Sequence, residues 1–418
     1  MRFSDFASSI RVETAFSVLA VAKRLKAEGK DVIELEIGDS PFATPAAAVE
    51  AGTGAIHDGL TRYGPSLGLP EFRAAAATYV NREYGLAVTA ANVVAGQGAK
   101  IFEQLFCEAF LNPGDGVLVF SPHFPTYPPN IERRGARVVL SRLSPARDFR
   151  PDPAEVRRFV KEDPSPRAIF INSPHNPTGG VATLEDFQAI AGALQGTDVV
   201  VFSDEPYDRM VWKGRHHSPL EVPGMIDRTV AAYTFSKSFS MSGWRLGFAV
   251  GAAATIDMLG KLTNTTLSCV PPFIQMAGVA ALEKARDDRD RSMKEFQRKV
   301  ELLVAALGRV EGITCAMPVG SFYVFPSVAG VCNRLGITSH GLAMYLLEGA
   351  DPKRGVACLG GECFGEAGAG FLRLSCAEPD DRLASAVEFI AEAVTRRDRV
   401  TAYLASHPEH RLAGAYGN

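Results

Sequence analysis

The sequence predicts an α/β protein, in which a large three-layer αβα domain with a mixed, mostly parallel sheet is joined to a smaller α+β domain. Short apolar runs alternate with helical stretches from about residue 50 to 280. Such alternation requires crossover connections that place helices on both faces of a sheet. Near Pro271 and Pro272 the pattern changes to a long stretch rich in Arg, Lys, Asp and Glu. We take this change as the passage into the smaller domain.

The other elements follow from the same patterns. The stretch from about 275 to 307 predicts one long helix with a solvated charged face. Residues 320–326 and 370–375 predict strands, and a helix is expected between them around 339–348. We therefore expect four segments, which are an N-terminal arm packed with the small domain (1–45), the large domain (46–280), the small domain (281–395) and a C-terminal tail (396–418). The last residues of the tail, 407–418, are expected to be loosely held.

Composition excludes several classes of function. The 418 residues, 46% of them hydrophobic, suffice for a large core, and the net charge of −3 argues against a nucleic-acid surface. The first residues lack the apolar stretch of a signal peptide, and no later apolar run is long enough to span a membrane. Seven irregularly spaced cysteines predict free thiols, mostly buried, in a cytoplasmic protein.

The pair His216-His217 is assigned to a solvated loop, and no metal is expected, because no third ligand lies at workable spacing.

The most informative residue is Lys237, which follows Thr234-Phe235-Ser236 and precedes Arg245 by eight positions. An amine flanked by hydroxyl groups suits an aldehyde that carries a phosphate. The amine condenses with the aldehyde as a Schiff base, and Thr234 and Arg245 hold the phosphate. Pyridoxal 5'-phosphate fits this description. Since most lysines are solvated surface charges, the prediction depends on further segments.

Two of these segments follow apolar runs that predict buried strands. Asp204 comes directly after such a run, at the strand end where open α/β sheets bind ligands. A carboxylate there keeps a pyridine nitrogen protonated, which lets the ring accept electrons, although an Asp after a strand often caps a helix instead. Asn176 lies in a loop rich in Pro and Gly. Its amide suits the phenolic oxygen of the cofactor, beside the Tyr207 hydroxyl, but Asn before Pro is as often a turn former.

Two more segments complete the set. Gly98, Ala99 and Lys100 lead from a strand into a helix, so that their amides can point at an anion on the helix dipole. Phe124, in a loop after the next strand, offers a ring to stack on a flat heterocycle. Taken alone, two glycines are a weak signal, and an aromatic ring in a Pro-rich loop is more often simply packed.

With these segments in this order, the chain resembles the class I and II aminotransferases, which are pyridoxal-phosphate enzymes of fold type I, from about residue 10 to 395. The motifs that carry the resemblance are Glu36-Ile37-Gly38-Asp39, Thr61-Arg62-Tyr63-Gly64-Pro65, Gly98-Ala99-Lys100, Asn176-Pro177-Thr178-Gly179, Asp204-Glu205-Pro206-Tyr207, Ser236-Lys237, Gly243-Trp244-Arg245-Leu246-Gly247 and Phe371-Leu372-Arg373-Leu374-Ser375.

The resemblance implies a role for each matched position. Lys237, Asp204 and Tyr207 would be catalytic. The residues that would bind pyridoxal phosphate are Gly98, Ala99, Lys100, Phe124, Asn176, Asp204, Tyr207, Thr234, Lys237 and Arg245. Tyr63 would reach the phosphate of the other subunit, which implies a homodimer with shared active sites. Arg373 would grip the substrate α-carboxylate with its planar fork, helped by Asn176 and the backbone at Gly38.

The implied reaction moves the amino group of an L-amino acid to a 2-oxo acid in a ping-pong sequence. The same set of residues serves lyases, oxidases and decarboxylases, and the motifs around Lys237 do not separate these outcomes. A pyridoxal-phosphate-binding regulator is disfavoured because no DNA-binding module precedes residue 10 or follows 395. Candidate side-chain pocket residues are Phe16, Asp39, Ser40, Phe42 and the loop at 265–272. The acidic Asp39 suggests a donor with a basic side chain, as in arginine transaminases.

Overall fold

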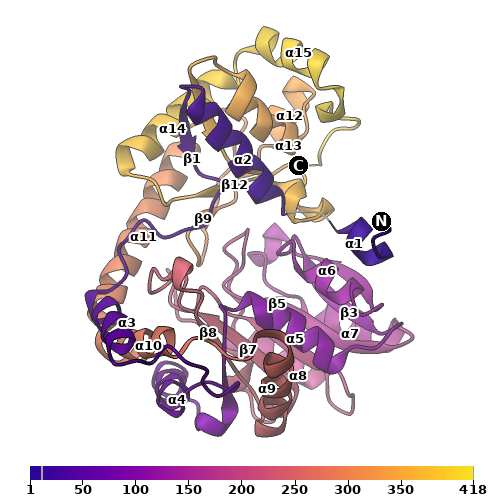
Figure 1. The fold of residues 1–418 in the computed structure, drawn as a ribbon. Coiled ribbons are helices and arrows are strands. Elements are labelled where there is room, and N and C mark those ends of the chain that lie inside the picture. The colour runs from indigo at the N-terminus through magenta and orange to yellow at the C-terminus, as the bar shows by residue number, and fades with distance from the viewer. Residues whose placement is uncertain (11–12, 418) are drawn as a thin grey trace.

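The computed structural model describes residues 1–10 and 13–417 and has two parts, one below and one above in Figure 1. The lower part is built on a seven-stranded sheet with the order β2-β8-β7-β6-β5-β3-β4. Its strands are β2 (Val93–Gly96), β3 (Gly116–Ser121), β4 (Arg137–Arg142), β5 (Pro166–Asn172), β6 (Val200–Asp204), β7 (Thr229–Thr234) and β8 (Gly247–Val250). Among these, β8 alone runs antiparallel to its neighbours. The prediction of a mixed, mostly parallel sheet is confirmed.

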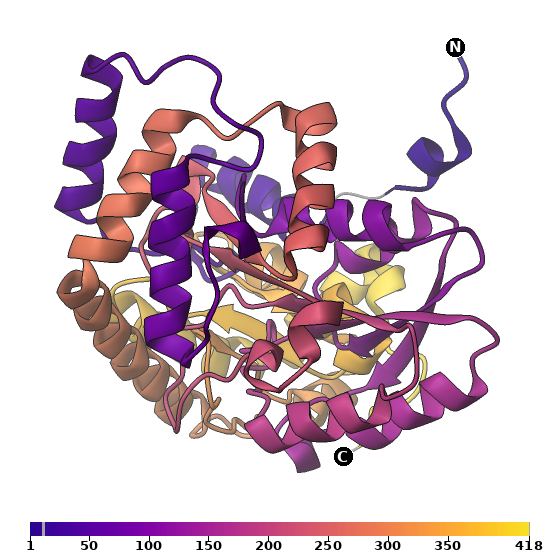
Figure 2. The same ribbon diagram turned by 90° about the horizontal axis from the view of Figure 1, so that it is seen from below.

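Alternating residues of each strand point to opposite faces of this sheet. Phe170 and Phe202 belong to one hydrophobic cluster, while Ile169 and Val201 belong to another. Helices cover both faces of the sheet (Figure 2). On one face lie α5 (Lys100–Phe110), α6 (Tyr127–Glu132) and α9 (Ala253–Leu267). On the other face lie α7 (Pro153–Glu162) and α8 (Leu184–Ala193). Three further helices, α3 (Ala46–His57), α4 (Pro70–Tyr84) and α10 (Pro272–Lys284), pack together at the β2–β8 end. The expected layers of helix, sheet and helix are present.

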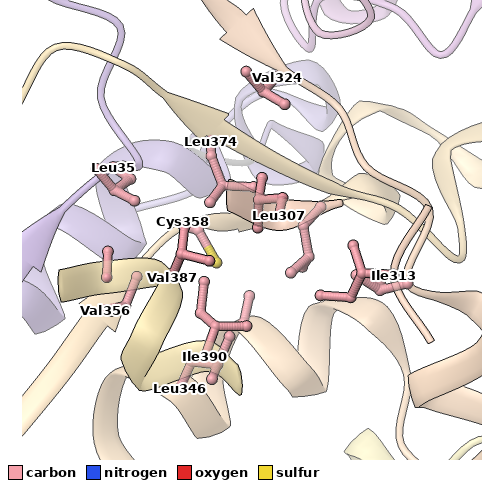
Figure 3. Packing of buried hydrophobic residues seen from close by; sticks show 14 of the residues in the cluster. Leu35, Leu307, Ile313, Val324, Leu346, Val356, Cys358, Leu374, Val387 and Ile390 are labelled. Atoms are coloured by element: carbon pink, nitrogen blue, oxygen red, sulfur yellow. The ribbon is translucent and has the colours of Figure 1, made fainter. Parts of the chain in front are cut away.

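The upper part has its own apolar core, which Figure 3 shows in close-up. Strand β1 (Asp31–Glu34) pairs in parallel with β10 (Arg354–Ala357), and β11 (Leu359–Gly360), β12 (Leu372–Ser375) and β9 (Tyr323–Val324) form an antiparallel sheet. Around them lie α11 (Arg286–Leu307), α12 (Ala329–Leu335), α13 (Ser339–Met344) and α14 (Asp380–Ala393). The expected strands are present but shorter than 320–326 and 370–375.

The single long helix predicted over 275–307 is wrong. Two helices, α10 and α11, meet at Ala285, whose backbone (φ −102°, ψ 22°) leaves the helical region. The break lets α10 pack on α3 and α4, while α11 carries Phe296 and Leu303 into the upper core. Charge patterning alone does not reveal such a break, because both helices keep a solvated face.

The N-terminal segment contacts both parts. Helix α2 (Thr14–Ala27) packs on the upper part, where Val18 and Ala22 meet Leu359 and Phe364. Helix α1 (Asp5–Ser9) lies beside α6 instead (Figure 1), and the guanidinium of Arg133 stacks over the Phe6 ring. The proposed domain boundaries stay a prediction.

The C-terminal segment is not a loosely held tail. Helix α15 (Arg397–Ser406) buries Val400 and Leu404 in the upper core. Beyond it, the Tyr416 hydroxyl donates to Glu362 Oε1 at 2.7 Å, and Tyr416 also packs on Gly370. Sequence position near a terminus does not predict such anchoring, because it depends on these contacts with distant residues.

Candidate active site

The carboxyl ends of the parallel strands meet at one edge of the large sheet, below the upper part. There a cavity of about 510 Å³ is lined by residues of both parts. Every predicted site residue except Gly98 and Tyr63 lines it, namely Gly38, Ala99, Lys100, Phe124, Asn176, Asp204, Tyr207, Thr234, Lys237, Arg245 and Arg373. Neighbouring parallel strands bring residues far apart in sequence to the same edge, as is usual for α/β proteins.

Lys237 lies in the turn after β7 and points toward the upper part. Its amine donates to the carbonyl oxygen of Gly38 at 2.6 Å, and the side chain is half-buried. This bond is a direct link across the cavity between the two parts. Gly38 is necessarily small, because a Cβ atom there would lie 1.7 Å from the Tyr323 hydroxyl oxygen.

Asp204 is the last residue of β6 and is buried. Burial raises its pKa to about 7, and the nearby Glu205 raises it as well, while the hydrogen bond from Tyr127 lowers it. The Tyr127 hydroxyl donates to Asp204 Oδ2 at 2.6 Å. Tyr127 was not predicted from the sequence, although its position three residues after Phe124, at the start of α6, is a signal.

A second buried acid lies on α5. Glu103 Oε2 accepts from the Thr126 hydroxyl at 2.5 Å and from Asn130 Nδ2 at 3.2 Å. Burial, and then the charge of Asp204, raise the pKa of Glu103 to about 8. This part of the cavity thus favours a cationic group, because each of the two carboxyl groups makes ionisation of the other less favourable.

The end of the cavity near α5 is rich in hydrogen-bond donors. Arg245 Nη1 and Nη2 reach the carbonyl oxygens of Ser242 (2.9 Å) and Gln97 (3.2 Å). Gly98 has φ +80°, and a Cβ there would lie 2.7 Å from Arg245 Nη2, so glycine is required for this approach. Hydroxyl and guanidinium donors beside a helix N-terminus suit a phosphate.

Thr234 and Ser236 bring the hydroxyls of this anion site together. The Thr234 hydroxyl donates to Ser236 Oγ at 2.9 Å, and Arg245 Nη1 approaches the same Ser236 oxygen at 3.5 Å. Ser236 lines the cavity, and the sequence analysis assigned it no role. Its place directly before Lys237 was the available signal.

Asn176 and Tyr207 also line the cavity and are both buried. The loop of Asn176 is held by its backbone amide, which donates to Asn172 Oδ1 at 2.8 Å. The Tyr207 hydroxyl donates to the Tyr323 hydroxyl at 3.2 Å. Burial, and then Tyr323, raise the pKa of Tyr207 well above its ordinary value, so that Tyr207 stays protonated and can act as a donor.

Arg373, on β12, is buried at the other end of the cavity. Its Nη1 donates to Asn176 Oδ1 at 3.2 Å, and its Nη2 donates to the Glu36 carbonyl oxygen. The guanidinium stacks 4.3 Å from the centre of the Tyr323 ring and 5.1 Å from that of Phe364. A planar fork held in this way is suited to a carboxylate.

At the mouth of the cavity, Lys100 lies over the Phe124 ring, with Nζ 5.0 Å from its centre. The same ammonium group forms an ion pair with Glu13 of the N-terminal segment. Phe124 is partly buried against the core under α5 and still lines the cavity. The Phe124 ring can therefore pack against the core and still be available for stacking in the cavity.

Tyr63 is not brought to this cavity. It is 89% exposed and lines a separate surface pocket with Cys269, Pro271 and Phe273. A contact of Tyr63 with the cavity of its own chain is thereby excluded in this structure, and the role expected across a subunit interface stays a prediction.

The assignment of His216 to a solvated loop is wrong. His216 is buried, and its Nε2 lies 2.7 Å from Glu205 Oε2. Glu205 also accepts from the hydroxyls of Ser203 and Ser218, each at 2.8 Å. The histidine is thus part of a buried polar network, which the adjacent glycine and charged residues in the sequence do not reveal. Within residues 1–10 and 13–417, no three His, Cys, Asp or Glu side chains form a metal-binding group.

No helix in the described part of the chain has both the length and the apolar character needed to cross a bilayer. The seven cysteines form no disulfide, and Cys107, Cys332, Cys358 and Cys376 are buried.

Comparison with known proteins agrees with this geometry. Residues 30–390 match the model of the family described as aminotransferase class I and II. An aspartate aminotransferase of Pyrococcus horikoshii is 33% identical over 367 residues, which cover 87% of this chain and 91% of that protein. An arginine–pyruvate transaminase of Pseudomonas aeruginosa is 33% identical over 376 residues, or 90% of this chain and 93% of that protein.

Solved structures show the same similarity. The Thermus thermophilus aspartate aminotransferase with maleate has a TM-score of 0.87 and 31% identity, and the match covers 94% of this chain and all of that one. The aspartate aminotransferase of Rhizobium meliloti has a TM-score of 0.87, 31% identity, and coverage of 95% and 99%. The resemblance inferred from the motifs is thus confirmed, and the chain is an aminotransferase that belongs to the class I and II aminotransferase family.

Proposed function

We propose that the chain binds pyridoxal 5'-phosphate through Lys237 and moves the amino group of an L-amino acid to a 2-oxo acid. The observation that supports this most is the convergence of an amine, a buried acid and an anion site in one cavity. Lys237 offers the amine, Asp204 the acid, and Gly98, Thr234 and Arg245 surround the anion site. When bound, the cofactor supplies an aldehyde for imine formation and a protonated ring that accepts electrons.

The donor set fits this group. Asp204 is deep in the cavity and has Tyr127 as a hydroxyl donor, but no cation of residues 1–10 and 13–417 lies within ion-pair distance of it. A buried carboxyl of this kind is stabilised by a protonated ring nitrogen. Tyr207 and Asn176 carry hydrogen-bond donors suited to the phenolic oxygen, and the exposed face of Phe124 suits stacking on the ring. Lys100 would contribute its backbone amide at the start of α5, beside that of Ala99.

The chain's own residues then divide the work of proton transfer. The Lys237 amine takes the proton from the substrate Cα, and it is held over the cavity by the Gly38 carbonyl oxygen. At the end of the cavity opposite Arg373, Asp204 provides the negative charge that compensates a protonated ring nitrogen. Arg373 fixes the substrate α-carboxylate, and Asn176 holds Arg373 in place through its side-chain oxygen. Because reacting groups are fixed at both ends, much of the entropic barrier is removed before the chemical step.

The charges that line the cavity bear on the amino donor. Lys237 and Arg245 serve the cofactor in this proposal, Arg373 serves the α-carboxylate, and Lys100 is paired with Glu13. No cation of the described chain is left for a second carboxylate, whereas the Asp39 carboxylate has no cationic partner there. We propose a donor with a neutral or basic side chain. The arginine–pyruvate transaminase relative supports this choice, and the aspartate aminotransferase relatives favour the alternative.

We also keep the homodimer as part of the proposal. The exposed Tyr63 and its pocket lie away from the cavity of the same chain, as a residue that serves another subunit requires. The cytoplasmic location expected from the unpaired cysteines likewise stays a prediction.

A labelling experiment tests the cofactor site directly. The protein is loaded with pyridoxal phosphate, reduced with borohydride and digested, and the peptide that contains residue 237 is expected to carry the label. Lys237→Ala should bind the cofactor without a covalent link. Labelling of another lysine, or of none, would show that the proposal is wrong.

The same loaded protein, given single amino acids without an acceptor, tests the reaction and the donor. Transamination converts the cofactor stoichiometrically and then stops, whereas a lyase, decarboxylase or oxidase releases product continuously. We expect arginine and neutral amino acids to react faster than aspartate at equal concentration. A rate with aspartate far above that with arginine would refute the donor assignment, but it would not contradict the proposed cofactor site.

A further inference from the structure

Glu36 is a buried acid without a visible partner. It follows β1, its side chain is 0% exposed, and neither carboxyl oxygen has a hydrogen-bond partner among the described residues. Buried carboxyl groups in folded proteins are nearly always hydrogen-bonded or paired, because leaving them unpaired costs several kcal/mol. A carboxyl group in this state therefore needs an explanation.

The neighbour of Glu36 is the substrate-carboxylate residue of the proposed function, Arg373. Arg373 Nη2 donates to the backbone carbonyl of Glu36, and Nη1 donates to Asn176, but the buried Nε has no acceptor. The acid and the guanidinium thus each keep an unsatisfied group in the same buried cluster. Both residues line the cavity, so the cluster borders the place where a substrate carboxylate would lie.

Other groups around Glu36 also act on its charge. Burial contributes most to the raised pKa of about 7, the residue's own backbone N–H lowers it, Glu34 and Glu378 raise it further, and Arg373 lowers it. Cys358, directly after the facing strand β10, has a raised pKa, first from burial and then from Glu36. Lys26 is paired with Glu34 at 2.5 Å, and Lys30, which directly precedes β1, donates to the Glu348 carbonyl oxygen at 3.2 Å. Arg373 is therefore the cation that is left to stabilise the ionised acid.

We propose that Glu36 is a positioning residue whose carboxyl group competes with the substrate carboxylate for the charge of Arg373. Glu36 is neutral when a carboxylate is bound to Arg373, and it can ionise when no carboxylate is bound there. Two carboxylates beside one guanidinium in a buried site cannot both ionise at low cost. Binding of the substrate carboxylate is therefore coupled to uptake of one proton from the solvent by Glu36. Release of the product carboxylate returns that proton to the solvent.

The direction of the pH effect follows from this coupling. Below the pKa of the free Glu36 the acid is already neutral, and a carboxylate binds without proton uptake. Above that pKa the ionised acid competes for Arg373, so that affinity falls as the pH rises. A group that merely fills space next to Arg373 would not produce this pH dependence.

The test uses the protein loaded with pyridoxal phosphate and 4-methylpentanoate, a carboxylate that lacks an amine and cannot react. Its inhibition constant is measured against the amino donor from pH 6 to 9, for the wild type, Glu36→Gln and Glu34→Gln. Glu34→Gln is the control for loss of a nearby acid: Glu34 ends β1 two residues before Glu36 and raises the pKa of Glu36, so its removal should move the pH dependence slightly to lower pH without abolishing it. We expect the ratio of the wild-type constant to that of Glu36→Gln to rise at least about tenfold between pH 7 and 9, and the ratio of the Glu34→Gln constant to that of Glu36→Gln to rise by a similar factor. The ratio of two inhibition constants is used because other groups in the site titrate in both proteins, so that their effect cancels.

A ratio that stays constant with pH would overturn the proposal, as would an equal effect of Glu34→Gln. The inference rests on Arg373 as the carboxylate site, and the two can be tested apart. If 4-methylpentanoate fails to compete in the wild type at any pH, Arg373 lacks the proposed role and the inference falls with it. If 4-methylpentanoate competes equally well at all pH values, only the proposed role of Glu36 is refuted.

A second measurement does not depend on a variant that folds. At pH 8, difference infrared spectra of wild-type protein labelled with ¹³C-glutamate are recorded with and without 4-methylpentanoate. We expect binding to produce a protonated carboxyl band that shifts with the label. Absence of such a band would count against proton uptake by Glu36.

Discussion

Replacing Tyr127 by phenylalanine removes one buried hydroxyl, which lies 2.6 Å from Asp204 Oδ2. A hydrogen bond to a charged group contributes about 1.5–3 kcal/mol, and one pKa unit corresponds to 1.36 kcal/mol. Because this bond favours the ionised acid, its loss should raise the pKa of Asp204 by about one to two units above the value of about 7. At pH 8 the ionised fraction of Asp204 in the cofactor-free protein should then fall from about nine tenths to between roughly a half and a tenth.

The measurement is the carboxyl ¹³C chemical shift of Asp204 in cofactor-free protein, followed from pH 5 to 10. The control is Tyr79→Phe, since Tyr79 is also buried and donates to another acid, Asp208, at the same 2.6 Å. We expect the Asp204 midpoint to move up only in Tyr127→Phe. In that variant, cofactor affinity at pH 8 should fall as well, because a neutral Asp204 no longer stabilises a protonated ring nitrogen. An unchanged midpoint, or an equal shift in Tyr79→Phe, would refute the reasoning.

Two further substitutions test other parts of the structure. Gly38→Ala places a Cβ 1.7 Å from the Tyr323 hydroxyl oxygen, and displacing that ring should cost about 1–3 kcal/mol, seen as a loss of about 5- to 100-fold in kcat/KM. Gly54→Ala, where a Cβ meets nothing within 4 Å, should leave kcat/KM unchanged, and similar losses in both variants would contradict the clash. Tyr416→Phe removes the hydroxyl bonded to Glu362 and should speed hydrogen exchange in the C-terminal segment by about fivefold, through a loss of about 1 kcal/mol. Unchanged exchange would show that this bond does not anchor the segment.

Much of the candidate site could be predicted because its residues sit at strand ends. Asp204 and Asn176 follow apolar runs, and parallel strands in one sheet end at the same edge. Lys237 and Arg245 were predicted to act together from a local motif instead, an amine flanked by hydroxyl groups with an Arg eight residues later, and in the structure they flank the end of β7 and the start of β8. The predictions for these residues needed only the local pattern and the rule for parallel sheets.

Other features could not be predicted because they depend on which distant segments pack together. The burial of His216 depends on Glu205, eleven residues earlier, and the anchoring of Tyr416 depends on Glu362, 54 residues earlier. The break at Ala285 depends on how α10 and α11 pack on different cores. In each case the local sequence is compatible with either outcome.

The sequence by itself determined the fold class, the family and the kinds of side chains present at the strand ends, because apolar periodicity and short motifs act over a few neighbouring residues. Only the tertiary structure decided which charges meet. The donation of Tyr127 to Asp204 and the placing of the Glu36 acid beside Arg373, 337 residues away, belong to this second group. The physical reason is that desolvation and charge interactions depend on distances in space between residues that are remote along the chain.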